Sequence, residues 1–161
     1  MNNNQNTNTI MMIRPFKFGF NLSTSEDNVY QNSYKMGVNS SQISKQALFE
    51  FDSFVRILQA SGVNVIEFND SGEYDTPDSV FPNNWISTHM DGSIWLYPMC
   101  SVNRRNERRN DIIDFLKKNF HVQNIYNNAS FYESNNQFLE GTGSMVLDRE
   151  HRIAYASSSQ R

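Results

Sequence analysis

The residues best suited to chemistry in this chain lie in the stretch TPDSVFPNNW, from Thr76 to Trp85. Asp78 is the only carboxylate of the stretch, and Asn83 and Asn84 add two amides. Because proline cannot donate to a sheet ladder, Pro82 argues against an ordinary strand, while the apolar neighbours argue against an ordinary loop. We therefore expect a stiff, half-buried segment that holds one carboxylate and two amides. On these residues alone, a turn cap is the simpler role for Asp78.

A second carboxylate, Glu140, lies 62 residues further along, in the stretch LEGTGSMVLDR. Gly141 and Gly143 allow the backbone there to turn sharply and to approach other groups closely. A surface carboxylate beside a flexible loop is the competing interpretation of Glu140.

The remaining reactive side chains show no pattern of a metal site. Cys100 is the only cysteine, so the chain forms no internal disulfide and no cysteine-rich metal site. It follows the stretch YPM, where a small packed residue before a loop is expected. His89, His121 and His151 lack metal-ligand spacing and are expected at turns or strand ends.

The elements that must position these residues follow from apolar periodicity. We expect helices over residues 41–61 and 104–120, and strands over residues 10–13, 63–68, 93–99 and 121–126, followed by two strands after the LEGTGS motif. The first helix has an apolar face made of Ala47, Leu48, Phe51, Phe54, Val55 and Leu58. Ser40 or Ser41 can cap its start, and Gly62 suits its end.

The expected elements repeat. Helix, strand, acidic loop, strand, turn and strand occur from Ser41 to Met99 and again from Arg104 to the terminus, with Asp78 and Glu140 in equivalent places. Such a period predicts a repeat architecture in which neighbouring units bury each other's faces.

Composition and charge argue against a nucleic-acid-binding, membrane-spanning or secreted protein. The net charge is -3, so we expect no broad attraction to nucleic acid or to an anionic membrane. No apolar run approaches the ~20 residues that span a bilayer. The Asn-rich residues 1–9 lack the features of a secretory signal and are expected to be a disordered tail, with residues 10–161 folded and the protein cytoplasmic.

Six stretches occur in a characteristic order: RPFKFGFN, TPDSVFPNNW, YPM, NRRNERR, LEGTGSMVLDR and AYASSSQR. Together they resemble the N-terminal half of the citrulline-utilisation hydrolases, amidinotransferase-like members of the pentein superfamily related to dimethylargininase and arginine deiminase. The resemblance implies an α/β fold, a pentein-type α/β-propeller, of which this chain would hold roughly the first two to three units. The two repeats should then be related by roughly a fifth of a turn, with both carboxylates toward one axis.

The resemblance also implies a reaction without a cofactor. A cysteine thiolate attacks the central carbon of a guanidino or ureido group, a histidine moves the proton, ammonia leaves, and water resolves the covalent intermediate. Asp78 would hold the terminal nitrogens of the substrate, since a fixed carboxylate accepts two planar N–H groups well. Glu140 would act in catalysis, flanking the histidine or gripping the substrate.

Amides and arginines complete the implied site. Asn83 and Asn84 both donate and accept, which favours the neutral ureido group of citrulline over a guanidinium, unless both amides only satisfy the turn. Arg105, or its neighbour Arg104, and Arg161 would hold the α-carboxylate of the substrate. Arg108 and Arg109 are expected on a solvated helix start.

The nucleophilic cysteine and the catalytic histidine of the family would lie beyond Arg161, so Cys100 is not expected to be the nucleophile. The chain is then expected to be an N-terminal fragment of the hydrolase, which binds a small amino acid and self-associates or needs a C-terminal half. Two alternatives remain open: a non-catalytic pentein remnant that binds an amino acid or a partner chain, and a simple α/β interaction domain.

Overall fold

The computed structural model describes residues 5–25 and 39–159, which form two compact units. One unit comprises residues 7–82, and the other comprises residues 83–161 together with residues 1–6. Arg161, residues 1–4 of the Asn-rich tail and residues 26–38 therefore lie outside the described residues. None of the helices in the described part is long and apolar enough to cross a membrane.

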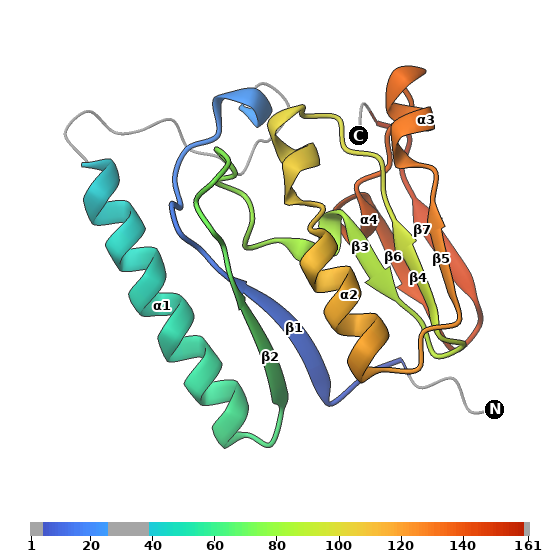
Figure 1. Ribbon diagram of the computed structural model, residues 1–161, viewed down its shortest axis with the longest axis horizontal. Helices are drawn as coiled ribbons and strands as arrows, with labels where there is room; N and C mark the ends of the chain where they lie inside the picture. Colours follow the sequence, from blue (N-terminus) through green and yellow to red (C-terminus); the bar gives the residue numbers. More distant parts are fainter. Residues whose placement is uncertain (1–4, 26–38, 160–161) are drawn as a thin grey trace. The chain divides into compact units, whose positions relative to one another are not determined.

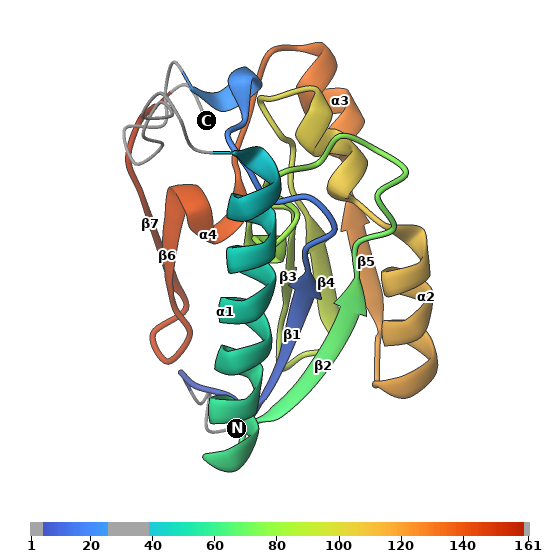
Figure 2. The same cartoon turned by 90° about the vertical axis from the view of Figure 1, so that its left-hand side faces the viewer.

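The first unit is built from two parallel strands and the helix that connects them. Strand β1 (Thr9–Arg14) pairs with β2 (Asn64–Asn69), from Thr9 opposite Asn64 to Arg14 opposite Asn69. Helix α1 (Ser40–Ala60) lies across this pair (Figures 1 and 2). Parallel neighbours need such a crossover because a tight turn cannot join them. Strand β1 begins at Thr9, within the segment predicted to be a disordered tail.

Two details of α1 differ from the expectation. The cap is Asn39, whose side-chain oxygen accepts a hydrogen bond from the backbone N–H of Ser41 at 2.9 Å, rather than Ser40 or Ser41. Phe54, predicted on the buried face, is 52 % exposed, whereas Val55 is buried. The two neighbours point about 100° apart around the helix, so only one of them can face the strands squarely. Gly62 ends the helix with a positive φ of 85°, as expected.

The second unit contains a three-stranded mixed sheet in the order β3–β4–β5. Strands β3 (Ile86–Thr88) and β4 (Ser93–Leu96) form an antiparallel hairpin whose connection contains Asp91 and Gly92. Strand β5 (Asn124–Asn127) runs parallel to β4, after the crossover helix α2 (Asn110–Asn119). Ile94 and Leu96 of β4 are buried, as are Ile112, Ile113 and Leu116 of α2, and these residues form much of the core. The order of these elements along the chain, β3, β4, α2 and β5, makes a ββαβ unit.

The expected helix over residues 104–120 is broken in the structure. A 3₁₀ helix, η3 (Asn103–Glu107), ends at Arg108, which has an extended backbone with a ψ of 95°, and α2 starts only at Asn110. The prediction of one continuous helix was therefore wrong. The side chains of Arg104 and Arg108 are drawn to buried carboxylates, and these contacts favour the break over the local helix propensity.

Two short helices and a hairpin follow β5. They are the short helices α3 (Ala129–Ser134) and α4 (Gly141–Ser144) and the antiparallel hairpin of β6 (Met145–Asp148) and β7 (Ile153–Ala156). A second 3₁₀ helix, η2 (Pro82–Asn84), precedes β3, and a third, η1 (Leu22–Thr24), precedes α1. The predicted order of helix, strand, acidic loop, strand, turn and strand thus occurs twice. The predicted rotation between the repeats stays a prediction.

Candidate active site

Arg104 lies at the centre of a buried polar cluster in the second unit. Its guanidinium binds both carboxylate oxygens of Glu107, with Nε 2.9 Å from Oε1 and Nη2 3.0 Å from Oε2. Nη2 also donates to the side-chain oxygen of Asn84 at 2.9 Å, and Nη1 lies 3.5 Å from Oε2 of Glu140. All four side chains are buried. A buried arginine in this position fixes the direction of three acceptors at once.

Glu140 is therefore no surface carboxylate. It is 2 % exposed, and its Oε1 accepts the backbone N–H of Cys100 at 3.2 Å, while its Oε2 faces Arg104. The competing sequence interpretation of a loose surface residue is wrong. The catalytic role that the resemblance implies for Glu140 stays a prediction.

The glycines beside Glu140 allow α4 to lie against the segment that carries the two amides. A Cβ added at Gly141 would overlap the backbone oxygen of Asn83, and one added at Gly143 would overlap the side-chain amide of Asn84. Gly141 also has a positive φ of 45°, which side chains rarely adopt. Close backbone approach is thus the physical reason for the pattern GTG.

The two amides have different surroundings. Asn83 is exposed, and its Nδ2 donates to the hydroxyl of Thr142 at 3.0 Å. Asn84 is buried, and its Oδ1 accepts from Arg104. These bonds join each amide to a side chain far along the chain, which differs from the local turn contacts that the alternative expected. The substrate contacts predicted for the two amides stay a prediction.

Arg105 holds the backbone that leads to Cys100. Its Nε donates to the carbonyl of Met99 at 3.0 Å, its Nη2 donates to the carbonyl of Cys100 at 3.3 Å, and its guanidinium lies 5.9 Å from the ring centre of Phe138. The side chain is about one-quarter exposed. Arg105 is thus partly accessible, as a substrate contact requires. It also fixes the backbone of Met99 and Cys100, next to Glu140.

Another buried carboxylate, Glu133, was missed by sequence reasoning. It accepts the backbone N–H of Met99 at 2.8 Å and both Nη atoms of Arg108, one of them at 2.9 Å. Burial raises the pKa of Glu133, but the hydrogen bonds from Arg108 and Met99 outweigh it, so the pKa lies below its usual value. Arg108 was predicted to be solvated, which is wrong, because it pairs with this buried group. No spacing rule links residues 25 positions apart across a loop.

Asp78 lies in the first unit, where it is 6 % exposed. Its Oδ2 accepts a hydrogen bond from the amide of Asn21 at 2.7 Å and lies 3.5 Å from the hydroxyl of Thr24. Both partners belong to η1 or its cap, more than 50 positions earlier. The neighbouring Ser79 donates its hydroxyl to a different carboxylate, Asp70, at 2.8 Å. Asp78 is thus a buried carboxylate held by tertiary contacts.

A polar chain crosses the hairpin of the second unit. His89 Nε2 lies 2.8 Å from the hydroxyl of Ser87, which lies 2.7 Å from the hydroxyl of Tyr97, and His89 Nδ1 lies 3.4 Å from Nη1 of Arg149. Burial lowers the pKa of His89, and the charge of Arg149 lowers it further, against a smaller opposite effect of Asp91. Burial also raises the pKa of Tyr97. His89 is therefore neutral at physiological pH.

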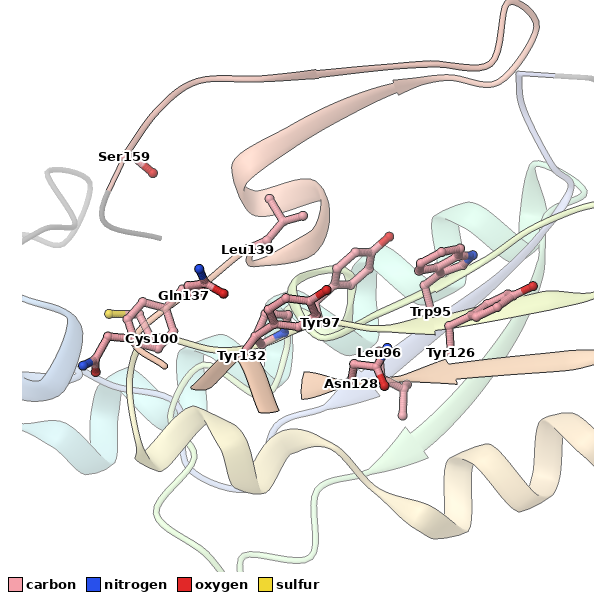
Figure 3. A pocket seen from close by; sticks show the side chains of 13 residues that line it. Trp95, Leu96, Tyr97, Cys100, Tyr126, Asn128, Tyr132, Gln137, Leu139 and Ser159 are labelled. Atoms are coloured by element: carbon pink, nitrogen blue, oxygen red, sulfur yellow. The ribbon is translucent and has the colours of Figure 1, made fainter. Parts of the chain in front are cut away.

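A cavity of about 920 Å³ opens beside this network. It is lined by Trp95, Leu96, Tyr97, Pro98, Cys100, Tyr126, Asn128, Tyr132, Asn136, Gln137, Phe138, Leu139 and Ser159. Trp95 and Tyr126 stack with ring centres 4.2 Å apart at one end, and Cys100 lies at the other (Figure 3). The lining has no Asp, Glu, Lys, Arg or His side chain, and five of its thirteen residues are aromatic. Within residues 5–25 and 39–159, no group of three or more His, Cys, Asp or Glu side chains could hold a metal ion.

The structure thus brings Glu140, Asn84 and Arg104 together and places Arg105 beside them. It places Asp78 in the other unit, and Arg161 lies outside the described residues. Glu107 and Glu133, the carboxylates that hold the arginines, were missed. Glu107 could have been found from its spacing of three residues after Arg104, which suits a pair on one turn of helix.

Comparison with known proteins places these features in a family. The family model of eukaryotic N,N-dimethylarginine dimethylhydrolase matches residues 14–161. No match is found among curated proteins. The apo structure of ArgZ, an arginine dihydrolase from the ornithine–ammonia cycle in cyanobacteria, has a similar fold, with a TM-score of 0.56 and 16% sequence identity. The similarity covers 94% of this chain but only 18% of that one, so this chain spans less than a fifth of its length. These matches support the pentein α/β fold.

Proposed function

The chain belongs to the N,N-dimethylarginine dimethylhydrolase family, and on that premise we propose that it is the N-terminal, substrate-binding part of a hydrolase. The hydrolase acts on the guanidino or ureido carbon of an arginine-derived amino acid. The observation that carries this proposal is the burial of Asp78 in a site shaped by tertiary contacts, within a chain of this family. A buried carboxylate is costly, and substrate binding is one reason to keep it.

In the proposed reaction Asp78 accepts two parallel N–H bonds from the planar end of the substrate. Glu140 has a fixed direction, because Arg104 and the N–H of Cys100 hold its two oxygens. A carboxylate held in this way can orient a histidine that carries the proton. Arg105 and Arg161 are proposed to bind the α-carboxylate of the substrate. These proposed roles also require the nucleophilic cysteine and the catalytic histidine of the reaction.

The proposed nucleophile is a cysteine outside residues 1–161, and so is the histidine. The thiolate adds to the central carbon, the C–N bond to the leaving amine breaks as that nitrogen takes a proton, and water then releases the product and the thiol. Within a partial propeller of two to three units, this chain would supply binding groups only. The alternative is a non-catalytic remnant that binds a small amino acid or a partner chain through the same groups.

Among the substrates of this class we propose citrulline over arginine. A ureido group has a carbonyl that accepts and N–H groups that donate, and an amide side chain can serve both. Asn84 Oδ1 already accepts from Arg104, so the exposed Asn83 is the residue on which this preference depends. With a complete protein, Asn83→Asp should shift the ratio of kcat/KM from citrulline toward arginine and methylated arginine. A native protein that is faster on arginine would contradict the preference.

The isolated chain provides the direct test of binding. Titration calorimetry should detect binding of citrulline or dimethylarginine, and Asp78→Asn should weaken it about tenfold or more. Asp75→Asn is the matched control, because the same change is made three residues earlier at an exposed side chain. Circular dichroism verifies that both variants fold. Equal binding by the two variants would contradict the role of Asp78.

Activity is tested on the same chain. It should release no ammonia or amine from citrulline, arginine or dimethylarginine until a C-terminal part that carries the cysteine and histidine is added. Turnover by the isolated chain that Cys100→Ser abolishes would overturn the proposal, because Cys100 would then be the nucleophile.

A further inference from the structure

A smaller cavity, of about 410 Å³, lies between the two hairpins of the second unit, and we call it the hairpin cavity. One wall is made of residues 89–91, from the connection between β3 and β4, and the other belongs to β6, β7 and the turn that joins them. Nη1 of Arg149 donates to the carbonyl of Thr88 at 3.0 Å, so a hydrogen bond ties the two hairpins together. The lining contains none of the residues proposed to bind the substrate, and its size suits a small molecule.

Two arginines bring free hydrogen-bond donors to one wall. Within residues 5–25 and 39–159, the guanidinium of Arg152 makes no hydrogen bond and no ion pair. Arg149 uses only Nη1, for Thr88 and His89, so its Nε and Nη2 have no acceptor among the same residues. Planar guanidinium groups with open donors are well suited to bind a carboxylate.

Asp91 places a negative charge on the opposite wall. Its Oδ1 accepts the backbone N–H of Ser93 at 2.9 Å, and in the described part of the chain no arginine or lysine pairs with it. Asp148, the other carboxylate of the lining, is engaged within its own turn, since Nδ1 of His151 lies 3.0 Å from its Oδ1 and 2.8 Å from its Oδ2. The hairpin cavity thus has a carboxylate on one wall and two arginines on the other.

This separation of charge restricts the class of ligand. A simple anion would also face Asp91, and a simple cation would also face the two arginines, so neither is attracted by the whole lining. A zwitterion can satisfy both walls. The rest of the lining is mostly apolar and includes Met90, Leu147, Ile153 and Ala154, which an apolar ligand side chain can cover.

We propose that the hairpin cavity is a binding site for a free α-amino acid with an apolar side chain. The carboxylate of the ligand accepts hydrogen bonds from Arg149 and Arg152, its ammonium group contacts Asp91, and its side chain packs on Leu147 and Ile153. Because Asp91 and Arg152 are exposed, the binding should be weak, with a Kd of roughly 0.1–1 mM. The proposal does not rest on the hydrolase reaction proposed above.

Ligand analogues test the need for both charges, in an NMR titration of the chain. L-Leucine should bind, whereas isocaproate, which lacks its ammonium group, and isoamylamine, which lacks its carboxylate, should each bind about tenfold more weakly. Isocaproate that binds as tightly as leucine would show a simple anion site, and isoamylamine that does so would show a simple cation site. Either outcome, or no detectable binding of leucine, would overturn the proposal.

The signals that shift in the same titration test the location. Leucine should shift the signals of His89, Arg149 and Arg152 and should leave those of α3, which lies outside the lining, unchanged. Shifts that gather instead at Arg105 would place leucine in the proposed substrate site and contradict a separate site in the hairpin cavity.

Arg152→Asn tests the arginine wall without disturbing the turn. Arg152 has a positive φ of 59°, a left-handed conformation that Asn adopts more readily than other side chains do. The variant should bind leucine about tenfold more weakly, while its melting temperature stays equal or rises. Arg56→Gln is the control, because it removes the same charge at an exposed residue of α1. Equal binding of leucine by the two variants would overturn the contact with Arg152.

Asp91→Asn tests the opposite wall. Asn keeps a side-chain oxygen for the N–H of Ser93 but loses the negative charge. Leucine should bind about tenfold more weakly to this variant, whereas isocaproate should bind as well as before or better, because a repulsion is removed. Asp114→Asn, at an exposed residue of α2, should change neither. A variant that weakens both ligands equally would show that Asp91 only shapes the turn, and would contradict the ammonium contact.

Discussion

The guanidinium of Arg104 and the carboxylate of Glu140 face each other in the interior, with Nη1 3.5 Å from Oε2 and both side chains almost fully buried. Glu107 takes the closer contacts with the same guanidinium. One positive charge is thus shared between two buried carboxylates. Arg104 is therefore a structural residue of this buried cluster, and the substrate carboxylate contact that we propose is assigned to its more exposed neighbour Arg105.

Removal of Arg104 should be costly. Arg104→Met keeps much of the volume but leaves Glu107 and Glu140 buried without the arginine, so we expect a loss of about 3–5 kcal/mol in the free energy of unfolding. Chemical denaturation measures this loss. Lys117→Ala is the control, because the pair of Lys117 with Asp114 is exposed and should contribute less than about 1 kcal/mol. A similar small effect for both variants would show that Arg104 does not stabilise the cluster.

Gly143 should tolerate no side chain. Gly143→Ala would place a methyl group against the side-chain amide of Asn84 and push that amide away from Arg104, at a cost of about 1–3 kcal/mol. Ser144→Ala, one residue later in α4, should change the stability by less than about 0.5 kcal/mol. Denaturant unfolding of the two variants makes the comparison. If Gly143→Ala is as stable as Ser144→Ala, α4 does not pack closely on Asn84.

Glu133 should give the protein an acid-sensitive contribution to stability. Its folded pKa lies below the usual value of 4.5, since hydrogen bonds from Arg108 and Met99 outweigh burial. The contribution is therefore present above about pH 4.5 and is lost as the pH falls through the folded pKa. Glu133→Gln should be less stable than the parent at pH 7, and the difference should narrow below pH 4.5. Unfolding curves that stay parallel from pH 7 to pH 3 would contradict this linkage.

His89, a basic group, should make the stability of the protein depend on pH in a higher range than the acidic Glu133 does. Burial and Arg149 hold its folded pKa below 6.5, so the unfolded chain binds a proton that the folded chain does not. Stability should fall as the pH drops from 6.5 toward the folded pKa, and His89→Gln should flatten that part of the profile. An NMR titration of the His89 ring gives the folded pKa directly. A value above 6.5 would contradict the assignment.

Much of the fold could be predicted because its signals are local. The face of α1 that contains Val55, the Asp91–Gly92 turn and the strand alternation around Ile94 each depend on residues within a few positions of one another. The same holds for the order of elements that repeats along the chain. The stretch around Asp78 was also recognised as stiff and half-buried, since prolines and apolar residues constrain it locally.

The site was decided by the tertiary structure. Asp78 is held by Asn21, 57 positions away, and Glu140 by Arg104, 36 positions away, and no sequence period connects such pairs. The break at Arg108 has the same origin, because a buried carboxylate 25 positions later pairs with that side chain. The sequence identifies the residues that can carry a charge. Only tertiary packing determines which of these charged side chains are buried together, because a charge is buried only where the fold supplies a partner of opposite charge or hydrogen-bond donors.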